Sequence, residues 1–458
     1  MKVTAVLLAA GQGTRMISDI PKMLHPVCGQ PMVFHALNAA QKASTEQPVV
    51  VIGHGADVVK KAIGDAARCV VQEEQLGTGH AVLQAESLLR GKLDLILVTY
   101  GDMPLLRGET LFQLVEMQKT NQGPITLLTV IADNPRGFGR ILRNPDGTVS
   151  AIVEEAAATP EQLTINELNV GAYCFSADWL WDALHRIPVS KKGEYYLTDT
   201  VELAVKDNLP VQALLMEDMV ETIGINTRVH LAEAEAAMRK RINEQHMLAG
   251  VTFIDPASTY IEAAVSIGRD TVIWPGTYLF GKTSIGANCQ IGPNSHIRDT
   301  QIGDGCVVLM SVMDKAVLED HVDVGPFARL RKGAHLCQGV HMGNFGEVKD
   351  STLGPGVKMG HFSYIGNAQV GANTNIGAGT ITCNFDGEKK HPTEIGEDAF
   401  IGSDTMLIAP VKLGNGARTG AGAIVTKNVP DDTLVVGMPA RAIRKLQRKP
   451  KNDSSNHS

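Results

Sequence analysis

The chain has few aromatic residues and no pair of cysteines spaced as zinc ligands usually are. Only 5% of its 458 residues are aromatic while 46 are glycine, which indicates a region built from small, repeated turns. The seven cysteines are scattered and include no Cys-x-x-Cys pair. We therefore expect reduced, buried thiols rather than a disulfide framework or a structural zinc site.

Long apolar runs and an excess of positive charge are also absent. The first residues enter an apolar stretch without a charged leader, and no apolar run is long enough to cross a membrane, which predicts a cytoplasmic protein. The net charge of -7 gives no reason to expect a nucleic-acid or membrane partner. At 458 residues the chain is too long for one hydrophobic core, so it should form at least two domains.

Residues 1 to about 226 alternate apolar runs with amphipathic stretches. Residues 49–53 and 95–100 are predicted to be parallel strands, and residues 31–43 a helix between strands. This pattern is typical of a doubly wound, Rossmann-like α/β domain, in which ligands bind outside the carboxyl ends of the strands.

A glycine-rich loop follows the first predicted strand. Gly11 and Gly13 would let the backbone approach an anion, and Arg15 and Lys22 add positive charge, so the loop predicts a phosphate site. It is not the dinucleotide fingerprint, because Met16 stands where a third glycine is required, and it lacks the Gly-Lys-Ser/Thr ending of a P-loop. An ordinary strand-to-helix turn with two glycines is the alternative.

Two further groups of polar residues follow predicted strands. The Gln72 amide carries a donor and an acceptor that suit the edge of uracil, and Gly77 and Thr78 permit close contact with a base. The alternative is a helix start capped by Thr78. Asp102 follows the strand at 95–100, where a carboxylate is well placed for Mg²⁺, although it would also serve as a helix cap.

The composition changes after residue 227. Residues 228–248 contain neither Gly nor Pro and are rich in helix formers, which predicts one long connecting helix ended by Gly250. Aliphatic residues then recur every six positions over some 160 residues, which is the signature of a hexapeptide β-helix. The first of these positions are Ile267, Ile273, Leu279, Ile285, Ile291 and Ile297.

Residues 8–16, together with residues 21–25, resemble the signature of sugar-1-phosphate nucleotidyltransferases. Within them the chain is most similar to the bifunctional enzymes that acetylate glucosamine-1-phosphate and then uridylylate the product to UDP-N-acetylglucosamine. The resemblance extends from Val3 to about Val436. It implies Mg²⁺ bound by Asp102 and Asn226, UTP and acetyl-CoA as co-substrates, and a β-helix that is left-handed and assembles into a homotrimer.

The resemblance also implies site residues in the first domain. Arg15 and Lys22 would act in catalysis by neutralising the triphosphate. The implied nucleotide and sugar contacts are Leu8, Ala9, Gly11, Gly13, Lys22, Gln72, Gly77, Thr78, Tyr100, Gly101, Asp102, Gly139, Glu154, Asn169, Thr198 and Asn226.

For the β-helix, the residues alone leave an assembly platform and an active site equally open. The resemblance implies an acetyltransferase with His361 as the catalytic base. It implies glucosamine-1-phosphate contacts at Arg331, Lys349, Tyr364, Asn375 and Lys390, and acetyl-CoA contacts at Ala378, Asn384, Phe385, Ser403 and Ala421. One departure is Met438, which aligns with an arginine implicated in acetyl-CoA binding; Arg441 or Arg444 would have to replace it.

These observations together predict a chain with four segments. Residues 1–227 form the nucleotidyltransferase domain, 228–250 a linker helix, 251–438 the left-handed β-helix, and 439–458 a basic and polar tail without order. The predicted function is acetyl transfer followed by uridylyl transfer with release of pyrophosphate. The alternatives are a nucleotidyltransferase for another sugar-1-phosphate whose β-helix is only an assembly or regulatory platform, and a scaffold that binds nucleotide without turnover.

Overall fold

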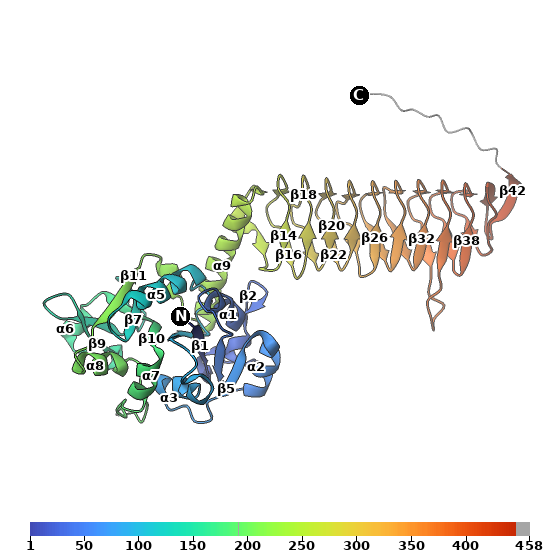
Figure 1. Cartoon of the computed structure of the whole chain (residues 1–458). Coiled ribbons are helices and arrows are strands. Elements are labelled where there is room, and N and C mark those ends of the chain that lie inside the picture. Colours follow the sequence, from blue (N-terminus) through green and yellow to red (C-terminus); the bar gives the residue numbers. More distant parts are fainter. Residues whose placement is uncertain (191, 446–458) are drawn as a thin grey trace. The chain divides into compact units, whose positions relative to one another are not determined.

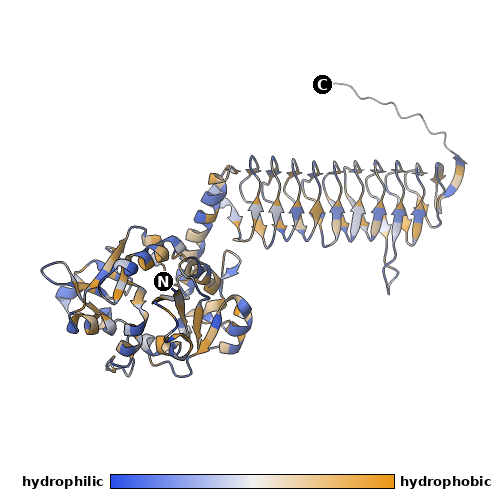
Figure 2. Cartoon of the chain, in the orientation of Figure 1, coloured by the Kyte–Doolittle hydropathy of each residue, from blue (hydrophilic) through white to orange (hydrophobic). Residues whose placement is uncertain are grey.

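The structure is a computed structural model that describes residues 1–190 and 192–445. The chain forms two compact units, which divide within helix α9 (Arg228–Leu248) after Met238 (Figure 1). Blue and orange segments alternate along the helix in Figure 2, in keeping with its mixture of charged and apolar residues. Gly250, just beyond its end, has a φ of 94°, the left-handed conformation that glycine adopts readily after a helix. Among the described residues, no helix has the length and apolar character needed to cross a membrane.

The first unit is built on a nine-stranded sheet. Seven strands lie in the order β11 (Val211–Met216), β7 (Ile125–Ile131), β10 (Glu167–Ser176), β6 (Leu95–Tyr100), β1 (Val3–Ala9), β4 (Val49–Ile52) and β5 (Arg68–Val71). Strand β10 is antiparallel to both neighbours, while the other adjacent pairs are parallel. Strands β8 (Arg140–Arg143) and β9 (Val149–Val153) extend the sheet from β10. The predicted strands near residues 3–8, 49–53 and 95–100 are thus confirmed.

Both faces of this sheet are covered by helices. In β1, Ala5 and Leu7 belong to one core cluster and Val6 and Leu8 to the other, because successive side chains of a strand point to opposite faces. Helices α1 (Met32–Lys42) and α5 (Gly108–Thr120) pack into the first cluster, and α3 (Thr78–Leu83), α7 (Ala177–Leu184) and α8 (Asp199–Lys206) into the second. Burial on both sides explains why the strand sequences are continuously apolar. The remaining helices are α2 (Ala56–Ile63), α4 (Glu86–Leu89) and α6 (Pro160–Leu163).

The second unit is a β-helix made of three parallel sheets, drawn as a stack of coils in Figure 1. The sheets start at β12 (Thr252–Phe253), β13 (Tyr260–Ile261) and β14 (Ser266–Ile267). Aliphatic residues six positions apart fall on successive sheets and point inward: Ile273, Leu279 and Ile285 are at most 4% exposed. Its middle coils include the strands β23 (Val317–Leu318), β25 (Arg329–Leu330), β26 (Ala334–Leu336), β28 (Gly346–Lys349), β31 (Ser363–Gly366), β33 (Asn375–Ile376) and β34 (Ile381–Cys383).

The coils are not uniform in length. Ile273 pairs with Ile291, and Ile291 in turn pairs with Val308, so the second of these two coils is slightly shorter than the first. The coil from Asn375 to its partner Phe400 is much longer, because residues 384–392 form a loop that projects from the stack in Figure 1. Lys390 and Phe385 of this loop form an isolated antiparallel bridge. Extra residues are therefore accommodated outside the stacked core.

The C-terminal end differs from its prediction. Arg441–Lys445 forms strand β42, which pairs antiparallel with β41 (Thr433–Val436), so the predicted disorder of the tail from residue 439 does not hold for these five residues. All five are exposed. A basic, polar sequence gave no sign of the strand because it is held by backbone pairing at a sheet edge rather than by burial. The rest of the predicted tail, residues 446–458, lies outside the described residues.

Candidate active sites

The glycine-rich loop lies at the carboxyl end of β1. In the described part of the chain, the backbone N–H groups of Gly11, Gln12 and Gly13 donate to no acceptor. Gly13 has a φ of 65°, and a Cβ there would come within 2.7 Å of Lys22 Cβ, so no other residue fits. Arg15 is exposed in the short helix at Thr14–Met16. The loop thus offers free N–H donors and two cationic side chains to an anion.

A buried cation connects three of the predicted residues. Lys22 Nζ donates to Asp102 Oδ2 at 2.5 Å and to Asn226 Oδ1 at 2.8 Å, and its side chain is 8% exposed. The Ile225 N–H donates to the Asp102 carbonyl oxygen at 2.9 Å, which holds the two loops together. The carboxylate and the amide oxygen therefore converge on one point that already holds a positive charge.

A first cavity, of about 320 Å³, opens beside this point. Its walls include Leu8, Gly11, Lys22, Gln72, Gly77, Thr78, Tyr100 and Asp102, all predicted nucleotide or sugar contacts. Gln72 Nε2 donates to the Gly77 carbonyl oxygen at 3.1 Å, so the amide is held at the base of the loop that it begins. Two residues of the predicted phosphate site, Gly11 and Lys22, thus face the same cavity as the predicted uracil contacts.

The loop at Gly77 and Thr78 is fixed by a distant segment. Gly77 has a φ of 97°, and a Cβ there would lie 2.6 Å from the Tyr195 carbonyl oxygen. Thr78 Oγ1 accepts a hydrogen bond from the Leu197 N–H at 2.9 Å. This pairing brings residues 194–198 to the site.

A second cavity, of about 310 Å³, adjoins the first at Thr78, Tyr100, Asp102 and Tyr196, which line both. It is also lined by the predicted sugar contacts Gly139, Glu154, Asn169, Thr198 and Asn226. Glu154 Oε1 accepts from Thr198 Oγ1 at 3.2 Å, and Asn169 Nδ2 donates to Tyr173 Oη at 2.7 Å. Carboxylates, amides and hydroxyls therefore surround a space that suits a sugar.

The Tyr100 phenol lies between the two cavities. Burial, and then the charges of Glu154 and Asp102, raise the pKa of Tyr100, so the phenol keeps its proton. A Cβ at Gly171, whose φ is 91°, would come within 2.5 Å of the Tyr100 ring. Glycine at 171 therefore makes room for Tyr100.

Four predicted residues line neither cavity: Ala9, Gly13, Arg15 and Gly101. Gly101 packs behind the site, where a Cβ would lie 3.1 Å from Met23 Sδ. Glu194 and Tyr196, for which no individual contact was predicted, both line the first cavity. In the sequence, only their proximity to Thr198 indicated a binding role, because backbone hydrogen bonds between Tyr195 and the loop at Gly77 place their segment beside the cavity.

We expect Asp199→Asn to stabilise the protein at neutral pH. Burial, and then the charges of Glu202 and Glu154, raise the pKa of Asp199 from 3.8 to about 6. Between these values the native state holds a proton that the unfolded state has lost, so the Asp199 contribution to the free energy of unfolding falls as the pH rises from about 4 to about 6. Melting curves at pH 4 and pH 7 should show a gain for the variant only at the higher pH. An equal gain at both values would contradict the assignment.

In the β-helix, three cationic residues gather at one corner of the coils. Arg331 Nη1 lies 2.8 Å from Glu347 Oε1, and Lys349 Nζ lies 3.6 Å from Asp350 Oδ2. A contact with Lys349, whose positive charge adds to the effect, lowers the pKa of Lys390. Three cations with two carboxylates leave a positive site for an anion such as a phosphate.

Two more predicted residues lie at this corner. Tyr364 belongs to β31, which pairs with β28, and its phenol lies against Gly366. Asn384 is 6% exposed and donates from Nδ2 to Asn367 Oδ1 at 2.7 Å. It begins the projecting loop, which carries Phe385, 60% exposed, and Lys390.

His361 and three predicted acetyl-CoA contacts lie at the opposite end of the same sheet. Consecutive coils are joined there by the bonds Gly379 N–H to Phe362 O, Asp404 N–H to Ala378 O and Gly422 N–H to Ser403 O. These bonds place His361, Ala378, Ser403 and Ala421 in one column. His361 is exposed, and its ring has no hydrogen-bond partner among the described residues.

A single chain thus does not bring all predicted acetyltransferase residues together. His361 lies two residues before strand β31 (Ser363–Gly366), so the segment to Gly366 separates the two groups by at most about 16 Å, at ~3.3 Å per residue. Asn375 lies on another sheet, in β33, shortly before the His361 corner. Met438 is 73% exposed, and Arg441 and Arg444 belong to strand β42.

Comparison with known proteins gives the class of this chain. The family described as Nucleotidyl transferase matches residues 4–241, and the family described as Bacterial transferase hexapeptide (six repeats) matches residues 282–313 and 392–427. The chain is thus a nucleotidyltransferase joined to a hexapeptide-repeat transferase.

Whole-length relatives give the particular family. The chain is 47% identical to the bifunctional protein GlmU of Geobacillus sp. (strain WCH70), over 97% of either chain. It is 48% identical to that of Exiguobacterium sp. (strain ATCC BAA-1283 / AT1b), over 95% of this chain and 97% of the relative, and 47% identical to that of Heliobacterium modesticaldum, over 95% of each. The chain belongs to the bifunctional GlmU family.

The matches confirm the predictions of family, fold and overall function. The predicted family, the fold of a Rossmann-like domain followed by a left-handed β-helix, and the bifunctional transferase of UDP-N-acetylglucosamine synthesis are confirmed. The alternative in which the β-helix is only a platform is not favoured, because the relatives match both units. The roles of individual residues stay predictions.

Proposed function

We propose that each unit carries one reaction, and that the product of the β-helix is the substrate of the first unit. The β-helix acetylates glucosamine-1-phosphate with acetyl-CoA. The first unit then transfers uridylyl from UTP and releases pyrophosphate. The observation that supports this most is the adjoining pair of cavities, one beside the free N–H groups of the glycine-rich loop and one lined by sugar-binding groups.

In the first unit, the sugar phosphate attacks the α-phosphorus of UTP in line, and no protein nucleophile is needed. Gln72, Gly77 and Thr78 bind uracil, while Glu154, Asn169 and Thr198 orient the N-acetylated sugar. Arg15, Lys22 and the free N–H groups of the loop hold the triphosphate. Tyr100 separates the two substrates as a neutral phenol.

The residues around Lys22 fit a magnesium ion. Asp102 and Asn226 present the hard oxygen ligands that Mg²⁺ prefers, and both already contact a cation. When bound, Mg²⁺ would neutralise charge on the phosphates of UTP. Lys22 would then be free to turn from the carboxylate toward the phosphates.

In the β-helix, Arg331, Lys349 and Lys390 hold the phosphate of glucosamine-1-phosphate. His361, exposed and unpartnered among the described residues, takes the proton from the amine as it attacks the thioester. Tyr364 and Asn375 orient the sugar. Acetyl-CoA lies along Ala378, Asn384, Phe385, Ser403 and Ala421.

The separation between His361 and the cation corner supports a site shared between chains. We place it between copies of the β-helix in a homotrimer, acting in the cytoplasm on small-molecule substrates alone. We assign the uridylyltransferase to residues 1–227 and the acetyltransferase to residues 251–438, joined by the helix at 228–250.

The overall test is formation of UDP-N-acetylglucosamine from glucosamine-1-phosphate, acetyl-CoA and UTP. Substituting other nucleotides and other sugar phosphates checks the specificity. Uridylyl transfer without any release of CoA thiol would favour the platform alternative. A clear preference for another substrate pair would favour a different sugar-nucleotide product.

We expect Arg331→Gln to raise the KM for glucosamine-1-phosphate by about 10- to 100-fold, because a hydrogen bond to a charged group is worth roughly 1.5–3 kcal/mol. Release of CoA thiol against substrate concentration gives the value. Arg329→Gln is the matched control, since Arg329 is an exposed arginine of strand β25 to which the resemblance assigns no substrate contact. An equal effect of both changes would point to a general loss of charge.

A further inference from the structure

At one corner of the β-helix, nearly every coil has a glycine at the same position, but two consecutive coils have a different residue there. In the third sheet, from β14 to β38 (Val411–Leu413), the inward aliphatic residue of nearly every strand is followed by glycine. The neighbouring coils show this at Gly268, Gly286, Gly303, Gly354, Gly371 and Gly396. The exceptions are Glu319 after β23 and Cys337 after β26.

The glycines have a steric cause. A Cβ at Gly303 would lie 2.8 Å from the Glu319 carbonyl carbon, and one at Gly354 would lie 2.8 Å from the Val370 oxygen. At each of these corners, a side chain would therefore clash with the backbone of the next coil. Packing of the β-helix therefore does not explain why Glu319 and Cys337 occupy this position on neighbouring coils.

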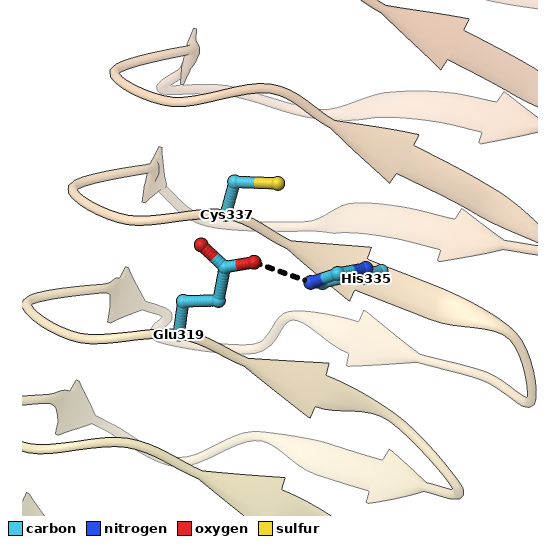
Figure 3. A group of neighbouring side chains, drawn as sticks. All are labelled: Glu319, His335 and Cys337. Carbon is cyan, nitrogen blue, oxygen red and sulfur yellow. Dashed lines mark hydrogen bonds and ion pairs between the residues drawn. The ribbon is translucent and has the colours of Figure 1, made fainter.

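Parallel pairing brings these two side chains together with a histidine. Leu318 pairs with Leu336, so the residues that follow them, Glu319 and Cys337, lie side by side. His335, which points outward from β26, completes the group, and Figure 3 shows the three side chains gathered on one side of the coils. One ligand atom from each residue lies within 4.8 Å of the others.

Hydrogen bonds within the group, and one from a neighbouring backbone N–H, orient the Glu319 carboxylate. Glu319 Oε1 lies 2.8 Å from His335 Nε2, and its other oxygen accepts from the Gln338 N–H at 2.9 Å. The Glu319 and His335 side chains are 43% and 39% exposed, so the group is open to solvent on one side.

We propose that Glu319, His335 and Cys337 form a binding site for a transition-metal ion of the zinc type, separate from both active sites. The ligand set is one thiolate, one imidazole and one carboxylate, which suits Zn²⁺ and not the hard ions Mg²⁺ and Ca²⁺. Its two negative ligands balance the charge of the ion. The Gln338 N–H holds the second carboxylate oxygen and so orients the first toward the metal.

Binding requires one proton transfer and small rotations of the side chains. The Cys337 thiol releases its proton to solvent, and His335 binds through Nε2 while its proton stays on Nδ1. At metal–ligand distances of about 2.0–2.3 Å and tetrahedral angles, Glu319 Oε1 and His335 Nε2, now 2.8 Å apart, have to separate slightly, while the ligand atoms of all three residues already lie within 4.8 Å of one another. A fourth, solvent-facing position remains for water or an exchangeable ligand, which is typical of zinc sites with three protein ligands.

The test uses Co²⁺ as a coloured substitute for Zn²⁺ in the full chain after removal of metals with a chelator. We expect an absorption band from charge transfer between thiolate and Co²⁺, which Zn²⁺ abolishes by competition. Co²⁺ bound at Asp102 and Asn226 gives no such band, because those ligands are oxygens. Absence of the band in the intact protein would overturn the proposal.

Variants separate this site from the other thiols. Cys337→Ser should abolish the band, and His335→Gln and Glu319→Gln should each weaken Co²⁺ and Zn²⁺ binding at least about tenfold. Cys383→Ser, which removes another partly exposed thiol of the β-helix, should change nothing. Cys337→Gly restores the corner glycine and should fold without binding metal. A band that persists in Cys337→Ser, or full affinity in both His335→Gln and Glu319→Gln, would refute the three-ligand site.

Discussion

Replacing His361 by alanine is expected to lower acetyl transfer by about 10²–10⁴-fold, the usual contribution of a general base. The imidazole is exposed at a corner of the β-helix and makes no hydrogen bond among the described residues, so its loss removes no hydrogen bond that supports the fold. The rate of CoA thiol release from acetyl-CoA with glucosamine-1-phosphate measures the effect. Uridylyl transfer, measured as pyrophosphate release, should be unchanged in the same preparation.

His341→Ala is the matched control for this experiment. His341 is another histidine on the outside of the β-helix, with a side chain 53% exposed, and it lies 3.7 Å from Asp323 rather than at the His361 corner. Its removal should leave both reactions intact. Acetyl transfer by His361→Ala within a few-fold of the unaltered protein would show that another group accepts the proton.

The second large effect is expected from Asp102→Asn, which should lower uridylyl transfer by about 10²-fold or more. The estimate follows from the several kcal/mol that a bound metal ion contributes to a transition state, at roughly 1.4 kcal/mol for each factor of ten. Pyrophosphate release at increasing Mg²⁺ concentration is the measurement. Acetyl transfer should be unaffected, which makes this variant and His361→Ala controls for each other.

The dependence on Mg²⁺ separates two roles of Asp102. The carboxylate also pairs with the buried Lys22 ammonium, and loss of that pair alone would lower the rate at every Mg²⁺ concentration. Loss of a metal ligand should instead raise the Mg²⁺ concentration needed for half-maximal rate. Asp57→Asn, a change in helix α2, should alter neither quantity. An unshifted Mg²⁺ requirement in Asp102→Asn would remove Asp102 from the proposed metal site.

Much of the fold could be predicted because its physical causes are local and periodic. Strand β1 is buried on both faces, so its continuous apolar run could be recognised without knowing its neighbours. The six-residue period of aliphatic residues identifies the positions that point into the interior of the β-helix. Strand β42 was not predicted, because backbone pairing with β41 stabilises it and none of its residues is buried.

The site was less accessible to prediction from patterns alone. Asp102 and Asn226 are far apart in the sequence, and the hydrogen bond from Ile225 that joins their loops has no sequence signal. Their proposed role came from the family resemblance. Glu194 and Tyr196 enter the first cavity through pairing of their segment with the loop at Gly77. By contrast, Glu319 and Cys337 are separated by one full coil, so comparing each position with its equivalent on the next coil would have revealed that they are neighbours.

The unequal coils have a consequence for how such a protein can acquire new chemistry. Asn375 and Phe400 pair in the usual register although a loop of extra residues separates their coils. An insertion at a corner therefore leaves the aliphatic interior and the strand ladders in place, since only the outside of the prism has to accommodate it. The hexapeptide stack behaves as a modular support on which inserted loops can diversify independently of folding, and grafting a foreign loop at residues 385–391 is a practical route to redesigning its specificity.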